Sequence, residues 1–97
     1  MDIQGAIGAL RERSLFAHLP ELRRLWLGCA ETLEDLANPN PDALPVDDGD
    51  IFSIYQLCKD DGVPTVADWL MATYGKRIGA FALEVTDLRD RMIESLR

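Results

Sequence analysis

The chain has 97 residues, of which 47% are hydrophobic and 28% charged, and its formal net charge at pH 7 is −7. This length fits one globular domain, 1–97, and the composition is not that of a disordered chain. The longest apolar runs are far shorter than the roughly 20 residues that cross a bilayer, and an acid at position 2 does not suit a signal peptide, so we expect a cytoplasmic protein without a membrane span.

The negative charge is concentrated in the middle third of the chain. Residues 31–61 carry nine acids and one lysine, a net −8, whereas residues 1–30 carry +1 and residues 62–97 carry 0. Such a segment repels nucleic acid and attracts basic partners, over a Debye length of about 8 Å in physiological salt. We therefore predict an acidic partner-binding surface that consists of Glu31, Glu34, Asp35, Asp42, Asp47, Asp48, Asp50, Asp60 and Asp61.

Two helices are predicted before residue 39. The first shows apolar residues at helical spacing from Ile3 and is expected to end near His18. Pro20 suits the first turn of a second helix, where the missing N–H costs nothing. Prolines at 39 and 41 stop this second helix. Its core-facing stripe repeats by threes and fours and consists of Leu22, Leu25, Trp26, Cys29, Leu33 and Leu36.

A loop and a third helix follow. Residues 38–50, NPNPDALPVDDGD, hold three prolines and four aspartates, a composition that favours a solvated, extended loop. Carboxylates stabilise the positive end of the helix dipole, so the third helix is expected to begin near Asp48 to Asp50. Gly62 is expected to end it.

The remaining residues predict a short helix and a longer one. Thr65 followed by Asp68 resembles a capping box, and Gly75 is expected to close the helix that it opens. The last helix is expected over residues 76–96, with Asp87 and Arg91 four apart on its wet face. Its apolar stripe is Ile78, Phe81, Val85, Leu88, Met92 and Leu96. The fold class is therefore all-α, a compact bundle of four to five helices with one Pro/Asp-rich loop over about 38–50.

No catalytic, cofactor or metal set can be assembled from these residues, so we expect no enzymatic activity. His18 is the only histidine, and VDDGD fails the calcium-loop pattern, because Tyr55 stands where the bidentate Glu belongs. Cys29 and Cys58 are interpreted as small buried hydrophobes; a disulfide between them is conceivable, whereas a zinc site is disfavoured.

One stretch suggests a helix-turn-helix. The segments CKDDGVP and TVADWL resemble the corresponding stretch in small terminase subunits of phages, in which an acid-acid-Gly-hydrophobe-Pro turn leads to a Thr-Val…Trp-Leu helix. The resemblance covers about a dozen residues, with a shorter turn, and implies DNA binding. Against it, residues 65–74 offer no Arg, Lys, Asn or Gln to base edges, and Asp60, Asp61 and Asp68 would repel phosphates.

Apolar side chains exceed what narrow stripes can bury. Trp26 with its leucine neighbours, and Trp69 with Leu70 and Met71, suggest an exposed apolar face for dimerisation or a partner. We predict a regulator or inhibitor that acts by protein–protein contact, such as phages and mobile elements encode, with the acidic surface steering a basic, nucleic-acid-binding partner. The alternatives are a helix-turn-helix DNA-binding or adaptor protein and a self-associating subunit whose last helix pairs with its twin.

Overall fold

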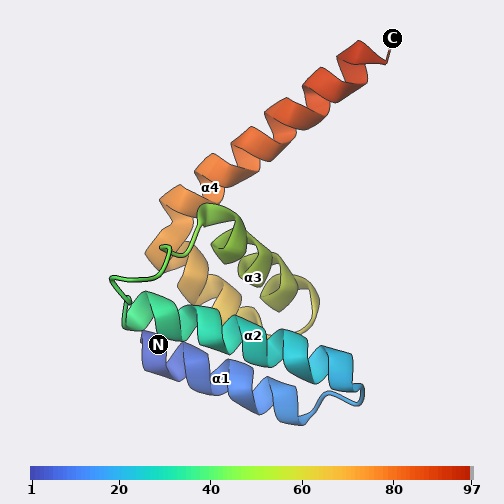
Figure 1. Cartoon of the computed structure of the whole chain (residues 1–97). Helices are drawn as coiled ribbons and strands as arrows, with labels where there is room; N and C mark the ends of the chain where they lie inside the picture. Colours follow the sequence, from blue (N-terminus) through green and yellow to red (C-terminus); the bar gives the residue numbers. More distant parts are fainter. Residues whose placement is uncertain (97) are drawn as a thin grey trace.

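The computed structural model describes residues 1–96 and contains four helices (Figure 1): α1 (Ile3–Leu15), α2 (Pro20–Ala37), α3 (Asp48–Asp60) and α4 (Pro64–Ser95). No strand occurs among these described residues, so the all-helical prediction is confirmed. Residues 38–47 form the long connection between α2 and α3.

Local chemistry explains where the first two helices begin and end. The carboxylate of Asp2 caps α1 by accepting a hydrogen bond from the Gly5 N–H at 2.8 Å, and Pro20 takes the first position of α2 as predicted. The expected end of α1 near His18 is too late. The N–H groups of Phe16 and Ala17 bond back to carbonyls only three residues earlier, which tightens the last turn and closes the helix at Leu15.

The turn between α3 and α4 is built on glycine. Asp47 caps α3 through the Asp50 N–H at 2.9 Å, so this helix begins within the expected range. At its other end Gly62 has φ +93°, and the Val63 N–H bonds the Cys58 carbonyl at 3.0 Å. This is the Schellman arrangement, in which a left-handed residue allows the chain to turn back on the helix end. The prediction that Gly62 ends α3 is therefore confirmed.

Replacing Gly62 by alanine is expected to destabilise the fold by about 1–2 kcal/mol, because a Cβ disfavours the left-handed backbone even where space is open. Gly8→Ala is the matched control: Gly8 lies inside α1 with nothing near its would-be Cβ, so this change should stabilise by about 1 kcal/mol. Urea unfolding followed by circular dichroism measures both. Equal effects of the two changes would contradict the assignment of this turn.

The last two predicted helices meet inside α4. This element spans Pro64 to Ser95, but its backbone is not helical at Tyr74, where φ and ψ are −121° and 20°, so two helices join at a kink one residue before the break expected at Gly75. The kink lies beside an edge-to-face contact between Tyr74 and Trp69, with ring centroids 5.9 Å apart. Beyond this kink, the second half of α4 leaves the rest of the molecule as a straight extension (Figure 1).

The core lies where the two helix pairs meet. α1 packs along α2, and α3 packs along the first half of α4. The largest fully buried side chains come from all four helices: Trp26, Ile7, Leu10, Leu33, Ile51, Leu70, Val66 and Cys58. Burial of α4 ends with Ile78, and Phe81 and Ala82 are half-buried. We call residues 1–81 the body and residues 82–96 the arm.

The arm gives the chain an extended shape. The radius of gyration is 15.0 Å, against about 13 Å for a compact domain of this length. The longest dimension, 46 Å, is nearly twice the shortest, 25 Å. The expectation of a compact bundle therefore applies to the body alone, and the arm is left with its own side chains uncovered.

Candidate interaction surfaces

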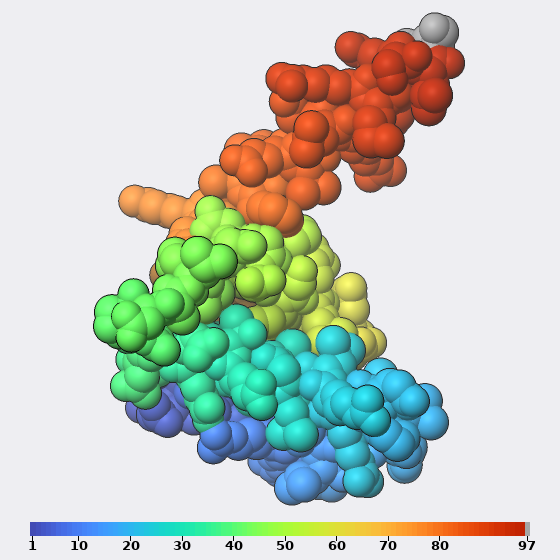
Figure 2. All heavy atoms as spheres, in the orientation of Figure 1, coloured from blue at the N-terminus to red at the C-terminus, as the bar shows by residue number. Residues whose placement is uncertain are grey.

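The arm carries an uncovered apolar strip. Along it the exposed fractions are 43% for Val85, 59% for Leu88 and 66% for Met92, and Ile93 and Leu96 extend the strip to the end of the helix. These residues line a shallow apolar groove with the stem of Arg89. In Figure 2 the arm stands clear of the body. The stripe predicted from sequence spacing exists, but beyond Phe81 nothing in the described chain covers it.

Charges are arranged around this strip. On an ideal helix Glu84 and Arg91 fall along one edge of the strip and Arg89 along the other, while Asp87, Asp90 and Glu94 take the opposite face. Arg91 also pairs with Asp87 at 3.0 Å, as the spacing predicts. The arm is thus an amphipathic helix with an apolar face, mixed charges at its edges and an acidic back.

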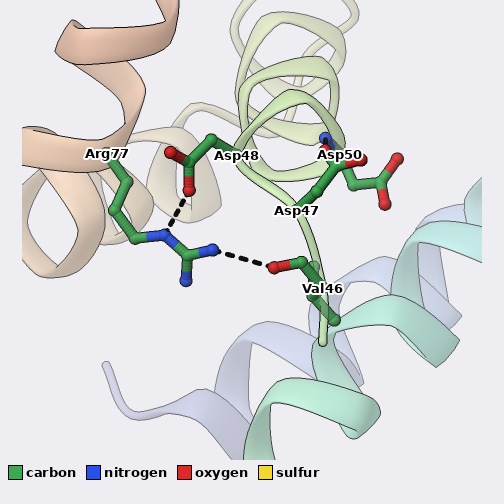
Figure 3. A network of polar contacts seen from close by, with 5 residues as sticks. All are labelled: Val46, Asp47, Asp48, Asp50 and Arg77. Carbon is green, nitrogen blue, oxygen red and sulfur yellow. Dashed lines mark hydrogen bonds and ion pairs between the residues drawn. The ribbon is translucent and has the colours of Figure 1, made fainter. Parts of the chain in front are cut away.

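The base of the arm is fixed to the start of α3. Arg77 donates through Nε to the Asp48 carboxylate at 2.5 Å and through Nη2 to the Val46 carbonyl at 2.8 Å (Figure 3). One turn further, the ring of Phe81 lies 5.2 Å from that of Phe52, and it covers Gly49 so closely that a Cβ there would be 3.2 Å away. Arg77 and Phe81 therefore set the direction in which the arm leaves the body.

The predicted acidic surface is divided by the fold. Glu31, Glu34 and Asp35 lie near the end of α2, Asp42 lies in the connection, and Asp47, Asp48 and Asp50 lie at the start of α3. Asp60 and Asp61, however, lie at the opposite end of α3, about 18 Å away along the helix. This separation exceeds the Debye length of about 8 Å, so they do not belong to one patch with the others.

Several of these acids have structural partners. Glu34 pairs with Arg11 of α1, Asp48 pairs with Arg77, and Asp47 caps α3. In Figure 3 the Asp50 carboxylate points away from Arg77. Asp35, Asp42 and Asp50 are exposed and form no ion pair among residues 1–96. We call these three residues the acidic edge; like Glu31, which is also exposed and has no ion pair among the described residues, they can meet a partner without breaking an internal contact.

The two tryptophans do not form an exposed face. Trp26 is 1% exposed and belongs to the core, with the guanidinium of Arg13 5.1 Å above its ring, so the expectation that it meets a partner is not met. The physical reason is that Trp26 lies on the face of α2 that is buried in the core, with Cys29, Ala30 and Leu33. Trp69 is half-buried and contacts Tyr74 edge-to-face, which leaves only part of its ring accessible.

The corner between α1 and α2 is a second apolar surface that sequence reasoning missed. Its exposed fractions reach 76% at Leu15 and 68% at Phe16, and Leu19 and Leu22 are exposed beside them. Leu15 and Phe16 lie outside the core-facing positions of α1, and this was the feature of the sequence that could have predicted their exposure. Arg23 holds this corner by donating to the Ala17 carbonyl at 3.0 Å.

The thiols and the histidine give no reactive site. Cys29 and Cys58 are buried and free. Burial raises the pKa of the Cys29 thiol, and burial together with the nearby Cys29 raises the pKa of Cys58 to about 12, so both stay protonated and unreactive at neutral pH. His18 is exposed. Within residues 1–96 no three His, Cys, Asp or Glu side chains come together to hold a metal ion.

A pocket of about 380 Å³ lies under the connection between α2 and α3. Loop residues from Pro39 to Val46 form most of its wall, and Asp35 and Arg77 supply its charges. Arg77 is already engaged by Asp48 and Val46. The described lining includes no histidine, cysteine or hydroxyl group, so the pocket offers no acid–base or nucleophilic set.

Comparison with protein-family models, with curated proteins and with solved structures finds no match to this chain. Among the described residues, no helix combines the length and the apolar character that crossing a bilayer requires.

Proposed function

We propose that this chain is a non-enzymatic protein that acts by protein–protein contact. The observation that carries the proposal is the arm: about one sixth of the chain projects from the body as a helix whose apolar strip no part of the described chain covers. Uncovered apolar strips on helices are typical of helix-pairing and groove-binding proteins, because covering them removes apolar surface from water.

The acidic edge gives the second part of the proposed mechanism. Asp35, Asp42 and Asp50 are exposed and have no ion-pair partner among residues 1–96, so their field acts on an approaching molecule. Exposed charge of one sign accelerates encounter with an oppositely charged surface and selects against the wrong partner. The partner whose surface charge complements the acidic edge is a basic, nucleic-acid-binding protein. The chain would then act as the regulator or inhibitor of that protein. A cytoplasmic setting stays part of this proposal, consistent with two thiols that form no disulfide.

The test compares two triple variants with the same change in net charge. In the first, Asp35, Asp42 and Asp50 are replaced by asparagine. In the second, asparagine replaces Asp60 and Asp61 at the other end of α3 and Asp68 near the start of α4. Each immobilised protein is exposed to extract from the native cell at low salt. We expect the wild type and the second variant to retain DNA-binding proteins, which rising salt or free duplex DNA releases. The first variant should not retain them. Retention that is indifferent to salt, or equal in all three proteins, would contradict the electrostatic mechanism.

The DNA-binding alternative receives no support from the exposed residues. On the first turns of α4 the exposed side chains are Pro64, Thr65, Asp68, Met71 and Ala72, none of which pairs with base edges as Arg, Lys, Asn or Gln does. Val66, Ala67 and Leu70 are buried in the body. We expect no gel shift of duplex DNA by micromolar protein at low salt.

A further inference from the structure

We propose that the partner of the apolar strip is the arm of a second copy of this chain, so that two arms pair as a short coiled coil. This inference rests on the proposed function, since it names the partner of the same strip, and it leaves the acidic edge of each body free for another protein.

The spacing along the strip is that of a coiled-coil seam. Phe81, Val85, Leu88 and Met92 follow one another by four, three and four residues, which are the a and d positions of a heptad. On an ideal helix these side chains fall within about 60° of one another, with Leu96 at the same face. Ile78 begins the same series but is already buried in the body. Phe81 is half-buried against Phe52, so the free part of the seam consists of Val85, Leu88 and Met92, and Ser95 takes the next d position.

The charges that flank the seam on one arm are complementary to those on a second copy of the arm. In an antiparallel pair with Val85 opposite Leu88 of the partner subunit, Glu84 meets Arg91 of the partner subunit, and symmetry repeats this contact. In a parallel pair, Glu84 meets the partner subunit's Arg89, again twice. Neither arrangement brings like charges together at these flanking positions, which set orientation and partner choice in coiled coils.

Other occupants fit the strip less well. The arm points away from its own body, so the chain cannot cover the strip by itself in this conformation (Figure 1). A membrane surface favours helices with lysine and arginine on the polar face, whereas the back of this arm presents Asp87, Asp90 and Glu94, which an anionic bilayer repels. A second arm matches both the apolar spacing and the charges.

The inferred dimer is tested by sedimentation equilibrium of the purified full chain over a concentration series, with two matched variants. Leu88→Asn places a polar group in the seam, whereas Leu83→Asn makes the same change on the opposite face, where the leucine is 73% exposed. We expect the wild type and Leu83→Asn to dimerise with equal constants. We expect Leu88→Asn, which alters both arms of a pair, to raise the dissociation constant about 100-fold or more.

Charge reversal identifies the orientation. Glu84→Arg is expected to weaken the dimer. Adding Arg91→Glu to it restores an antiparallel pair, and adding Arg89→Glu restores a parallel pair; rescue by either supports the proposal. A wild type that stays monomeric at high concentration overturns the proposal. So does an equal rise of the dimer's dissociation constant in Leu83→Asn and Leu88→Asn. Circular dichroism of each variant confirms that the body stays folded. A monomeric wild type that still binds a basic protein through the acidic edge would overturn only the dimer and leave the proposed function standing.

Discussion

Replacement of Trp26 by alanine is expected to destabilise the fold by about 3–5 kcal/mol, the largest loss expected from any single side chain of the core. The indole is 1% exposed and is the largest of the fully buried side chains. Removing it loses the transfer free energy of the ring and leaves a cavity in the core, together about 3–5 kcal/mol. Domains of this size are stable by about 5–15 kcal/mol, and this body is small, so the loss takes most of the total.

Trp69→Ala is the matched comparison, since that ring is half-buried, packing against the edge of the core and edge-to-face against Tyr74. Its loss should be clearly smaller, about 1–3 kcal/mol in line with partial burial. Urea unfolding followed by far-ultraviolet circular dichroism measures both variants. If Trp26→Ala were as stable as Trp69→Ala, Trp26 would belong to the exposed face that the sequence suggested, and the core described here would be wrong.

The second large effect is a loss of stability at alkaline pH through Cys58. Burial, with a smaller contribution from Cys29, raises the pKa of this thiol from 9.0 to about 12. Below pH 9 the thiol is neutral in both the folded and the unfolded chain and stability does not change. Between pH 9 and 12 the unfolded chain loses this proton while the native chain keeps it, so the free energy of unfolding falls as pH rises. The total loss is up to about 4 kcal/mol.

Cys58→Ala isolates this contribution from other groups that titrate in the same range. The variant starts less stable, because its smaller side chain leaves a cavity, but its stability should decline less steeply between pH 9 and 11. Urea midpoints at intervals of half a pH unit give the two slopes. Parallel declines would show that the thiol titrates equally in both states and that Cys58 is not buried as described.

Helix boundaries could be predicted from the sequence wherever a single residue decides the backbone. Gly62 ends α3 because only glycine adopts a φ of +93° without strain, and Asp47 begins α3 because its carboxylate reaches the Asp50 N–H. At Gly75 the same reasoning placed the break within one residue, since the backbone leaves the helical region at Tyr74. A glycine weakens a helix at such a point, and the chain resumes a helix directly after the kink.

The candidate surfaces could be predicted only in part, because helical spacing does not say what covers a stripe. The series from Ile78 to Leu96 is regular throughout, yet Ile78 is buried and Leu88 is exposed, since α3 reaches only the first part of it. Trp26 shows the reverse error: its apolar neighbours in sequence suggested an exposed ring, whereas the ring is buried in the core. The acids of 31–61 form one run in the chain, but a helix of 13 residues separates Asp47 from Asp61.

The central claim, that the arm is a pairing surface, is tested most directly by amide hydrogen exchange of residues 83–96 at increasing protein concentration. A helix of this length is marginal in water without a partner, so its amides exchange rapidly in the monomer. We expect their protection to rise with concentration, while protection of the body amides stays constant. Protection of the arm that is independent of concentration, whether high or absent, would contradict pairing through the strip.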